Sequence, residues 1–204
     1  MTDRMSHWEN VYTSKAEDEV SWFQENPAIS LRLIGDANAT RDSRIIDVGG
    51  GASRLADALL EQGFRAITVL DISAAALETA KMRLGERSAE VDWIVADITQ
   101  WTPSQIYDVW HDRAAFHFLT EPADRAAYAN ALRSATAPGS QVIIGTFALD
   151  GPERCSGLPV QRYDSSSLAQ TLGPAFELAD SSTEAHRTPW GAIQRFQFSR
   201  FRRV

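Results

Sequence analysis

The stretch Ile45-Ile46-Asp47-Val48-Gly49-Gly50-Gly51 decides the fold of this 204-residue chain. Its apolar side chains predict a short buried β-strand over 44–48, and three successive glycines end that strand in a tight turn. Glycines at such a turn let the backbone approach a ligand closely, and a helix that follows presents free amide groups to that ligand. The sequence therefore predicts a strand, a turn and a helix, with a ligand bound at the turn.

The segments on either side of this stretch repeat the same unit. Short apolar runs alternate with helical spacing of apolar residues, which predicts βαβ units and a mostly parallel sheet. Strands are predicted over 44–48, 66–70, 91–96, 107–111 and 141–147, and helices over 6–13, 27–34, 53–62, 74–84 (with Ser73 as N-cap) and 124–136. Residues 176–181 and 192–201 are predicted to form a closing antiparallel pair. The predicted fold is α/β, a seven-stranded sheet with helices on both faces.

The composition is that of an ordinary globular domain. Hydrophobic residues make up 44% and charged residues 23%, so one domain can bury its core without disulfides. The net charge of −7 disfavours a nucleic-acid partner, because an acidic surface repels phosphate. Apolar runs are too short for a signal peptide or a membrane span, which favours a cytoplasmic protein without a membrane partner. Four histidines and the single Cys155 lack the spacing of metal ligands, so no metal is expected.

Acidic side chains follow three of the predicted strands, at Asp47, Asp71 and Asp97. In open parallel sheets, ligands bind outside the carboxyl ends of the strands. Asp71 lies 20 positions after Gly51, a spacing at which a carboxylate can accept hydrogen bonds from both hydroxyls of a ribose. Asp97 and its neighbour Ile98 are placed to meet an adenine ring. The pattern predicts a nucleoside-binding site.

A nicotinamide dehydrogenase would use the same sheet, but its fingerprint is incomplete here. That fingerprint requires a third small residue after Gly49 and Gly51, and Arg54 stands at that position. The carboxylate of Asp47 would repel a pyrophosphate, whereas it would attract an ammonium or sulfonium group. A sulfonium cofactor is therefore favoured over a dinucleotide.

These motifs resemble those of class I S-adenosylmethionine-dependent methyltransferases. The similarity spans about residues 42–147, through the motifs at 45–51, 69–73, 95–98 and 107–113 and the turn at 138–140. It is specific to the superfamily and not to a substrate. Gly50 departs from the Cys, Ser or Thr that the family usually has there. The resemblance implies a Rossmann-like fold, S-adenosylmethionine as cofactor and S-adenosylhomocysteine as product.

The resemblance also assigns roles to individual residues. The glycine turn would lie against the methionine part of the cofactor, and Asp47 would fix this turn or bind the amino group through water. Asp71 would bind the ribose, and Asp97 with Ile98 the adenine. The cofactor-binding residues implied within this core are Asp47, Gly49, Gly50, Gly51, Asp71, Ile72, Asp97 and Ile98.

The segments 7–12 and 21–24 resemble the N-terminal lid of small-molecule methyltransferases of the thiopurine type, and that of a group of protein-lysine methyltransferases. In both groups aromatic residues fold over the methionine end of the cofactor. Trp8, Tyr12 and Trp22 are therefore expected to bury the cofactor, or alternatively to pack a helix onto the sheet. The single domain 1–204 would comprise a helical lid over 1–38, a cofactor-binding core over 42–147, and a substrate loop with closing strands over 148–204.

Methyl transfer is an in-line displacement, so alignment and exclusion of water matter most. A general base is needed only if the acceptor arrives protonated. Following the fourth strand, where the resemblance places the methyl group, His117 is the first candidate base and Asp112 the second. Arg113 could hold an acidic substrate; the alternatives are a packing role for His117 and a structural Asp112–Arg113 ion pair.

A small-molecule acceptor is favoured, because the sequence contains no extra recognition domain. The alternatives are a protein side chain, such as lysine, and a cofactor-binding module without turnover. The acceptor atom, and whether the protein is a monomer or a homodimer, stay open at this stage.

Overall fold

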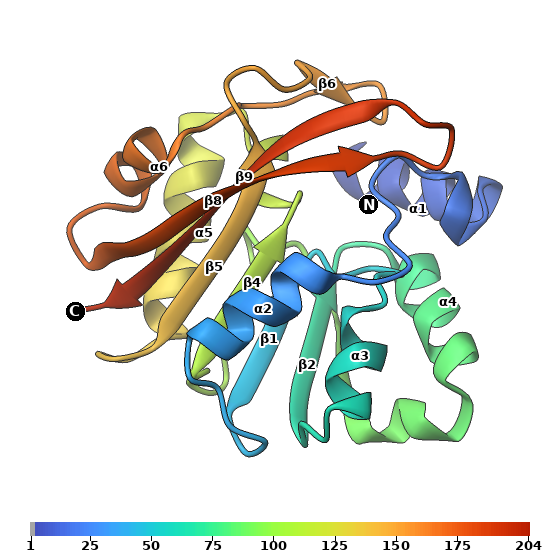
Figure 1. Ribbon diagram of the computed structural model, residues 1–204. Coiled ribbons are helices and arrows are strands. Elements are labelled where there is room, and N and C mark those ends of the chain that lie inside the picture. The colour runs from blue at the N-terminus through green and yellow to red at the C-terminus, as the bar shows by residue number, and fades with distance from the viewer. Residues whose placement is uncertain (1–2) are drawn as a thin grey trace.

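The computed structural model describes residues 3–204, and a seven-stranded sheet forms its centre (Figure 1). The strand order is β3-β2-β1-β4-β5-β9-β8. The strands are β1 (Arg44–Val48), β2 (Ala66–Asp71), β3 (Val91–Val95), β4 (Val109–Arg113), β5 (Gln141–Phe147), β8 (Phe176–Arg187) and β9 (Ile193–Arg203). Strands β1 to β5 pair in parallel, and β9 pairs antiparallel with both β5 and β8. The predicted α/β fold with a closing antiparallel pair is confirmed.

Helices cover both faces of this sheet (Figure 1). The first face carries α2 (Ala28–Asp36), α3 (Leu55–Glu61) and α4 (Ala74–Leu84), and the second carries α5 (Pro122–Ser134) and α6 (Ser165–Leu172). Helix α1 (Asp3–Ser14) lies beside α4 near the carboxyl ends of the strands. The remaining elements are the 3-10 helices η1 (Glu17–Glu19), η2 (Gly85–Glu90) and η3 (Phe116–Phe118) and the short strands β6 (Arg154–Cys155) and β7 (Leu158–Pro159). Within residues 3–204, none of the helices has the length and apolarity needed to cross a bilayer.

The central strands bury both of their faces, in two separate cores. Successive side chains of a strand point to opposite faces, so Ile45 packs in the core under α2 and α3 while Ile46 packs in the core under α5. Val109 and Trp110 divide between the two cores in the same way. A parallel strand covered on both faces needs a nearly continuous apolar run, and the sequence supplies one in each central strand.

The structure follows the predicted elements closely and differs at a few places. Strands 44–48 and 141–147 and helix 74–84 have the predicted bounds, and Ser73 caps that helix by accepting a hydrogen bond from the Ala76 amide. Strand β4 begins at Val109, two residues later than predicted, because Asp108 is drawn aside to accept a hydrogen bond from the Arg44 amide at 2.8 Å. The strand also ends two residues later than predicted, so Asp112 and Arg113 belong to β4 and not to the loop that follows it.

Helix α6 was not predicted. Its first turn is polar, and its buried residues are Leu168 and Leu172, which are too few to give a clear helical pattern. The available signal was its start: Asp164 accepts a hydrogen bond from the Ser167 amide at 2.8 Å, as the N-cap of a capping box does. Strands β8 and β9 extend well beyond the predicted ranges, since their polar outer residues continue to pair as an antiparallel hairpin.

Candidate active site

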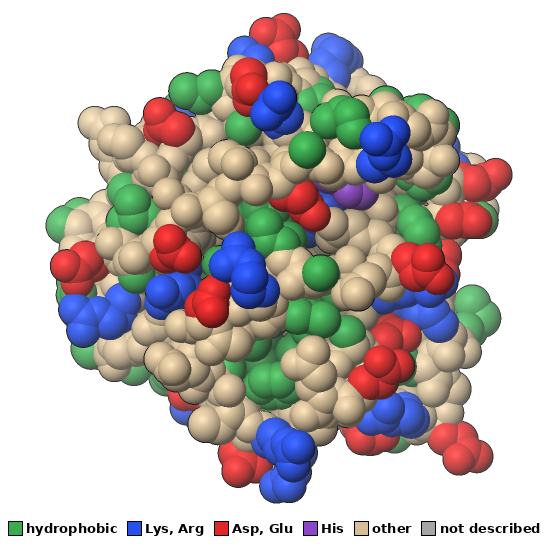
Figure 2. All heavy atoms as spheres, viewed as in Figure 1, with side chains coloured by type: hydrophobic (Ala, Val, Ile, Leu, Met, Phe, Trp, Pro, Cys, Tyr) green, Lys and Arg blue, Asp and Glu red, His purple; other side chains and the backbone are tan. Residues whose placement is uncertain are grey.

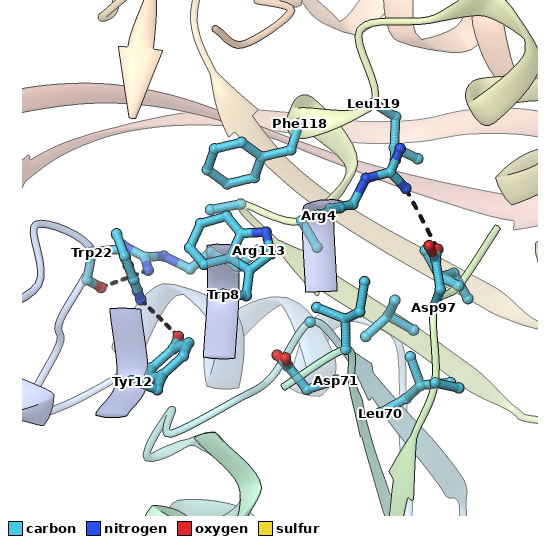
Figure 3. Close-up of a pocket in the computed structure, with 17 residues that line it drawn as sticks. Arg4, Trp8, Tyr12, Trp22, Leu70, Asp71, Asp97, Arg113, Phe118 and Leu119 are labelled. Carbon is cyan, nitrogen blue, oxygen red and sulfur yellow. Dashed lines mark hydrogen bonds and ion pairs between the residues drawn. The ribbon is translucent and has the colours of Figure 1, made fainter. Parts of the chain in front are cut away.

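A cavity lies over the carboxyl ends of β1, β2 and β3 and beneath the N-terminal segment (Figure 3). It brings together side chains that are far apart in the sequence. The predicted cofactor residues that line it are Trp8, Tyr12, Trp22, Gly49, Asp71, Ile72, Asp97 and Ile98. Arg113 also lines this cavity, together with Arg4, Phe118 and Leu119, which the sequence had not marked as site residues.

The glycine turn is shaped by close contacts on each side. Gly49 and Gly51 have φ values of +68° and +47°, a region that other residues rarely adopt. A Cβ on Gly49 would lie 2.3 Å from the Cβ of Ala115, and one on Gly51 would lie 3.0 Å from the Tyr12 hydroxyl. A Cβ on Gly50 would lie 2.6 Å from Oδ2 of Asp47, which accounts for the departure from the usual Cys, Ser or Thr.

Asp71 places a buried carboxyl group at the centre of the cavity. Its Oδ1 accepts a hydrogen bond from the Ser73 amide at 2.8 Å, and its side chain lies between Tyr12 and Leu70 (Figure 3). Burial raises the pKa of Asp71 to about 7, and the nearby charge of Asp47 adds to this shift. Such a carboxylate gains from a ligand that donates hydrogen bonds to it, as two ribose hydroxyls would.

Asp97 lies at the far end of the cavity and is tied to the lid. Its Oδ1 accepts hydrogen bonds from the Thr99 amide at 2.9 Å and from the Thr99 hydroxyl at 2.7 Å. The same oxygen lies 3.5 Å from Nη1 of Arg4, on α1 (Figure 3). Arg4 also pairs with Asp124, so this end of the cavity is closed by ion pairs that no local sequence pattern could reveal.

Aromatic rings from the N-terminal segment cover the middle of the cavity. The Trp8 ring packs edge to face against Phe118 at 4.8 Å and against Trp22 at 5.7 Å between ring centroids. Trp22 Nε1 donates a hydrogen bond to the Tyr12 hydroxyl at 3.3 Å (Figure 3). These rings therefore pack against one another and line the cavity at the same time.

His117 and Asp112 are completely buried, and neither of them lines either cavity. The His117 ring is completely buried against Phe147, and burial lowers its pKa to about 3. Asp112 is also completely buried; it accepts hydrogen bonds from the Tyr128 hydroxyl at 2.7 Å and from the Ala115 amide at 3.0 Å. Their assignment as general bases has no support in these positions, because neither side chain faces a space that an acceptor could enter.

Arg113 differs from these two residues because it reaches the cavity. Its Nη1 donates a hydrogen bond to the Trp22 carbonyl at 2.9 Å, and its guanidinium lies 4.6 Å from the centroid of the Phe196 ring. Burial lowers the pKa of Arg113 to about 10, so the side chain stays cationic at neutral pH. Within residues 3–204 it forms no ion pair with Asp112, so the structural pair that was considered as an alternative is not present.

A second cavity shares Tyr12, Trp22, Gly49 and Arg113 with the first. Its other walls are more polar and include the predicted cofactor residues Asp47 and Gly50. His111, near the end of β4, is buried and lines this cavity too. The two cavities together form one continuous candidate site from Asp97 to Asp47.

The segment 148–204 was expected to contain a substrate loop, and several side chains of residues 150–163 are buried or paired within the fold. Cys155 is buried, and this burial raises its pKa to about 11, so it carries a neutral thiol. Tyr163 packs in the core under α5 and α6, and Arg162 pairs with Glu153. His186 accompanies them at the lid, where its Nε2 donates a hydrogen bond to the Ser21 carbonyl at 2.7 Å. Across residues 3–204, no three His, Cys, Asp or Glu side chains are grouped as metal ligands would be.

Comparison with known proteins agrees with this site. Residues 45–139, which include the glycine turn, Asp71 and Asp97, match a family model described as a methyltransferase domain. The malonyl-(acyl-carrier protein) O-methyltransferase 1 of Ilyobacter polytropus is 28% identical over 135 residues, which make up 66% of this chain and 48% of that protein. The chain thus spans about half the length of that relative.

Solved structures show that the fold is shared over the whole chain. A SAM-dependent methyltransferase from Anabaena variabilis matches with a TM-score of 0.77 at 14% identity, covering 100% of this chain and 96% of that chain. The N-methyltransferase NodS of Bradyrhizobium japonicum, solved with S-adenosylhomocysteine, matches with a TM-score of 0.70 at 16% identity, covering 98% and 99%. Residues 45–139 therefore match a methyltransferase-domain family, and the chain as a whole has the fold of these methyltransferase structures.

Proposed function

We propose that this protein transfers the methyl group of S-adenosylmethionine to a small-molecule acceptor. The observation that carries the proposal is the first cavity, whose walls combine the Asp71 carboxylate, Gly49 of the glycine turn and the Asp97-Ile98 pair with the aromatic rings of Trp8, Tyr12 and Trp22. Each part fits a different portion of the cofactor: a carboxylate for the ribose, an apolar edge for the adenine, and a close-approach turn for the methionine. When bound, the cofactor supplies an electrophilic methyl group on a sulfonium.

The chain's own residues supply enclosure and alignment. Trp8, Trp22 and Phe118 surround the part of the site next to Arg113 and exclude water from it. Excluding water and fixing the geometry of the reacting groups are sufficient for much of the acceleration of an in-line transfer. We infer that the acceptor needs little help from a base, since His117 and Asp112 are held in the core.

A small acceptor is favoured by the closed form of the site and by the surface around it. The rings of the lid leave the cavity enclosed by side chains from α1 and η3, which suits a compact molecule better than a folded protein surface. On the face seen in Figure 2, basic side chains are interspersed with acidic ones and form no continuous basic band. A polyanionic acceptor such as nucleic acid is therefore disfavoured.

Isothermal calorimetry with S-adenosylhomocysteine, and with a nicotinamide dinucleotide as control, tests the cofactor part of this proposal. Binding of the first ligand at micromolar concentration and none of the second is expected. Absence of S-adenosylhomocysteine binding would remove the proposal altogether.

The acceptor is tested separately, with methyl-labelled S-adenosylmethionine and a cell extract divided into small-molecule and protein fractions. Label is expected in the small-molecule fraction, with an equal amount of S-adenosylhomocysteine formed. Label confined to protein would show a side-chain acceptor, and cofactor binding without any label transfer would favour a module without turnover.

A further inference from the structure

Arg113 is the charged residue of the first cavity that the proposed cofactor contacts leave unused. Four charged side chains line that cavity: Arg4, Asp71, Asp97 and Arg113. Arg4 pairs with Asp97 and with Asp124, and Asp71 is assigned to the ribose. Arg113 therefore remains as a cation available to a second ligand in the site.

The guanidinium of Arg113 has donor atoms that the protein does not use. Its Nη1 donates to the Trp22 carbonyl at 2.9 Å, whereas the buried Nε and Nη2 atoms have no hydrogen-bond partner among residues 3–204. Burial lowers the pKa of Arg113 and the charge of Glu184 opposes this effect, but Glu184 lines neither cavity and its Oε1 accepts a hydrogen bond from Gln24 at 2.8 Å. Buried guanidinium nitrogens without an acceptor are costly, and a carboxylate accepts two parallel hydrogen bonds from such a fork.

The side chains around Arg113 at this end of the cavity are aromatic. Figure 3 shows the Arg113 side chain extending toward Trp22, with Trp8 and Phe118 beside it and Asp97 at the opposite end of the cavity. Trp8 contacts both Trp22 and Phe118 edge to face. Aromatic rings pack well against other flat, apolar groups. This end of the cavity therefore fits a flat apolar body that carries an anionic group.

The ionisable groups of the first cavity supply no base at the Arg113 end. Burial raises the pKa of Tyr12, so its phenol stays protonated at neutral pH, and its oxygen accepts the Trp22 indole N–H at 3.3 Å. Asp97 lies at the opposite end, where it accepts hydrogen bonds from the amide and the hydroxyl of Thr99. An acceptor atom that binds beside Arg113 must therefore arrive without a proton.

The bases of the second cavity are engaged with other side chains. His111 Nδ1 lies 2.7 Å from Oδ1 of Asp47, and His111 Nε2 lies 2.9 Å from the Ser30 hydroxyl. This Asp47–His111–Ser30 chain is buried, and it occupies both ring nitrogens of the histidine. Glu17, the other carboxylate that lines this cavity, pairs with Arg54. The second cavity therefore offers no free base either.

We propose that the acceptor is a small carboxylic acid with a flat apolar body, bound through its carboxylate to Arg113 and methylated on a carboxylate oxygen. A carboxyl group has lost its proton at neutral pH, whereas hydroxyl, thiol and ammonium groups largely keep theirs. The inference rests on the proposed function, because it presumes methyl transfer from S-adenosylmethionine.

The reaction with such an acceptor needs no proton transfer. A carboxylate has about four lone-pair sites, so an oxygen that accepts a hydrogen bond from Arg113 keeps an electron pair for the methyl carbon. That pair forms the new C–O bond, while the electron pair of the breaking C–S bond goes to sulfur. The products are a methyl ester and S-adenosylhomocysteine, a neutral thioether. The opposite charges of carboxylate and sulfonium are thus both consumed.

Benzoate and benzamide test the recognition of the carboxylate, because they share a ring and differ in charge. Calorimetry of the protein saturated with S-adenosylhomocysteine should show benzoate binding at least about tenfold tighter than benzamide. Arg113→Gln should abolish this difference, and Arg113→Lys, which keeps the charge without the fork, should retain part of it. The affinity of Arg113→Gln for S-adenosylhomocysteine should stay near the wild-type value. Arg195→Gln, at an exposed arginine paired with Asp150, is the matched control and should change none of these affinities.

The site of methylation is tested on the labelled small-molecule fraction of the cell extract. Methyl esters release methanol in mild alkali, whereas methyl ethers and methylated nitrogen, sulfur or carbon keep the label. The label is therefore expected to become volatile on alkaline treatment. Arg113→Gln should lower this incorporation at least about tenfold at saturating cofactor, and Arg195→Gln should leave it unchanged.

Three outcomes overturn this proposal. Label that resists alkali would exclude an ester, and benzoate that binds no better than benzamide would exclude recognition of the carboxylate. A large loss of S-adenosylhomocysteine affinity in Arg113→Gln would show that Arg113 acts on the cofactor, or through the Trp22 carbonyl, and not on the acceptor. If the wild-type protein bound no S-adenosylhomocysteine or transferred no label at all, the proposed function itself would fail, which distinguishes the two failures.

Discussion

Burial and the proposed ligand binding have opposite effects on the pKa of Asp71. Burial raises its pKa from the ordinary 3.8 to about 7, so the free protein holds a proton there that the unfolded chain loses near pH 4. Its contribution to stability is therefore fully present below the unfolded-state pKa and is lost as the pH rises through about 7. A ribose that donates hydrogen bonds to the ionised carboxylate reverses this preference in the bound state.

Cofactor affinity should accordingly depend on pH through Asp71. Below pH 7 a proton must leave before the ribose binds, so S-adenosylhomocysteine affinity should fall by up to about tenfold per pH unit. Calorimetry between pH 6 and pH 8, in buffers of different ionisation enthalpy, measures both the affinity and the released proton. Asp71→Asn, which cannot ionise, should bind more weakly at pH 8 by about 1–3 kcal/mol and show a much flatter profile. Equal wild-type affinity at pH 6 and pH 8 would contradict the ribose assignment.

At the scale of elements, the N-terminal segment is a lid fixed at both of its ends. On α1, Glu9 accepts a hydrogen bond from the Ser73 hydroxyl at 2.8 Å, directly beyond Asp71 and Ile72, which line the first cavity. After η1, the Ser21 and Trp22 carbonyls accept hydrogen bonds from His186 and Arg113. The N-terminal segment is therefore held by hydrogen bonds of Glu9 and of two backbone carbonyls, and its aromatic rings line the cavity.

Trp22→Ala should weaken cofactor binding more than it destabilises the fold. The ring lines both cavities and contacts Trp8 and Tyr12, so its removal opens the site to water. A loss of roughly 1–2 kcal/mol in S-adenosylhomocysteine binding is expected from the lost aromatic contacts. Trp22→Phe keeps the apolar cover without the hydrogen bond to Tyr12, and it should retain most of the affinity. A lowered melting temperature with intact affinity would assign Trp22 to packing alone.

At the scale of the whole molecule, Arg83 connects the lid to the cofactor-binding core. Its guanidinium, on α4, pairs with Asp57 on α3 at 2.7 Å and with Glu17 on η1, and it donates to the Ala52 carbonyl beside the glycine turn at 2.9 Å. Glu17 also pairs with Arg54, and these pairs hold its pKa below the usual range although partial burial opposes them. One network therefore fixes two helices, the lid and the turn.

Arg83→Gln should lower stability and cofactor affinity together, because it releases all of these elements at once. We expect a loss of about 2 kcal/mol in the free energy of unfolding, which in a domain of this size lowers the melting temperature by roughly 4–8 °C. Thermal unfolding with and without S-adenosylhomocysteine measures both effects. Arg87→Gln, at an exposed arginine paired with Glu90 on η2, serves as control and should leave both near wild type. A normal melting temperature for Arg83→Gln would show that the network adds little to the fold.

The sequence by itself determined the sheet, the glycine turn and the acids at the strand ends. These features are local: a buried strand needs an apolar run, and Gly49, Gly50 and Gly51 are needed where the backbone has no room for a Cβ. The placement of Asp71 and Asp97 in one cavity follows as well, because the carboxyl ends of parallel strands share one edge of a sheet. The aromatic residues Trp8, Tyr12 and Trp22 were also identified from the sequence, and all three line the first cavity.

The tertiary structure alone decided which polar side chains reach the site. His117 and Arg113 lie four positions apart in the sequence, yet one is enclosed by Phe147 in the core and the other borders both cavities. The Asp47–His111–Ser30 chain joins three elements, and Arg4 meets Asp97 across 93 positions of sequence. Such contacts depend on how helices pack against the sheet, and packing is set by the sum of many distant apolar contacts. No local pattern of residues encodes that sum. The sequence therefore could not show that His117, the predicted general base, lies in the core, or that Arg113 borders the cavities.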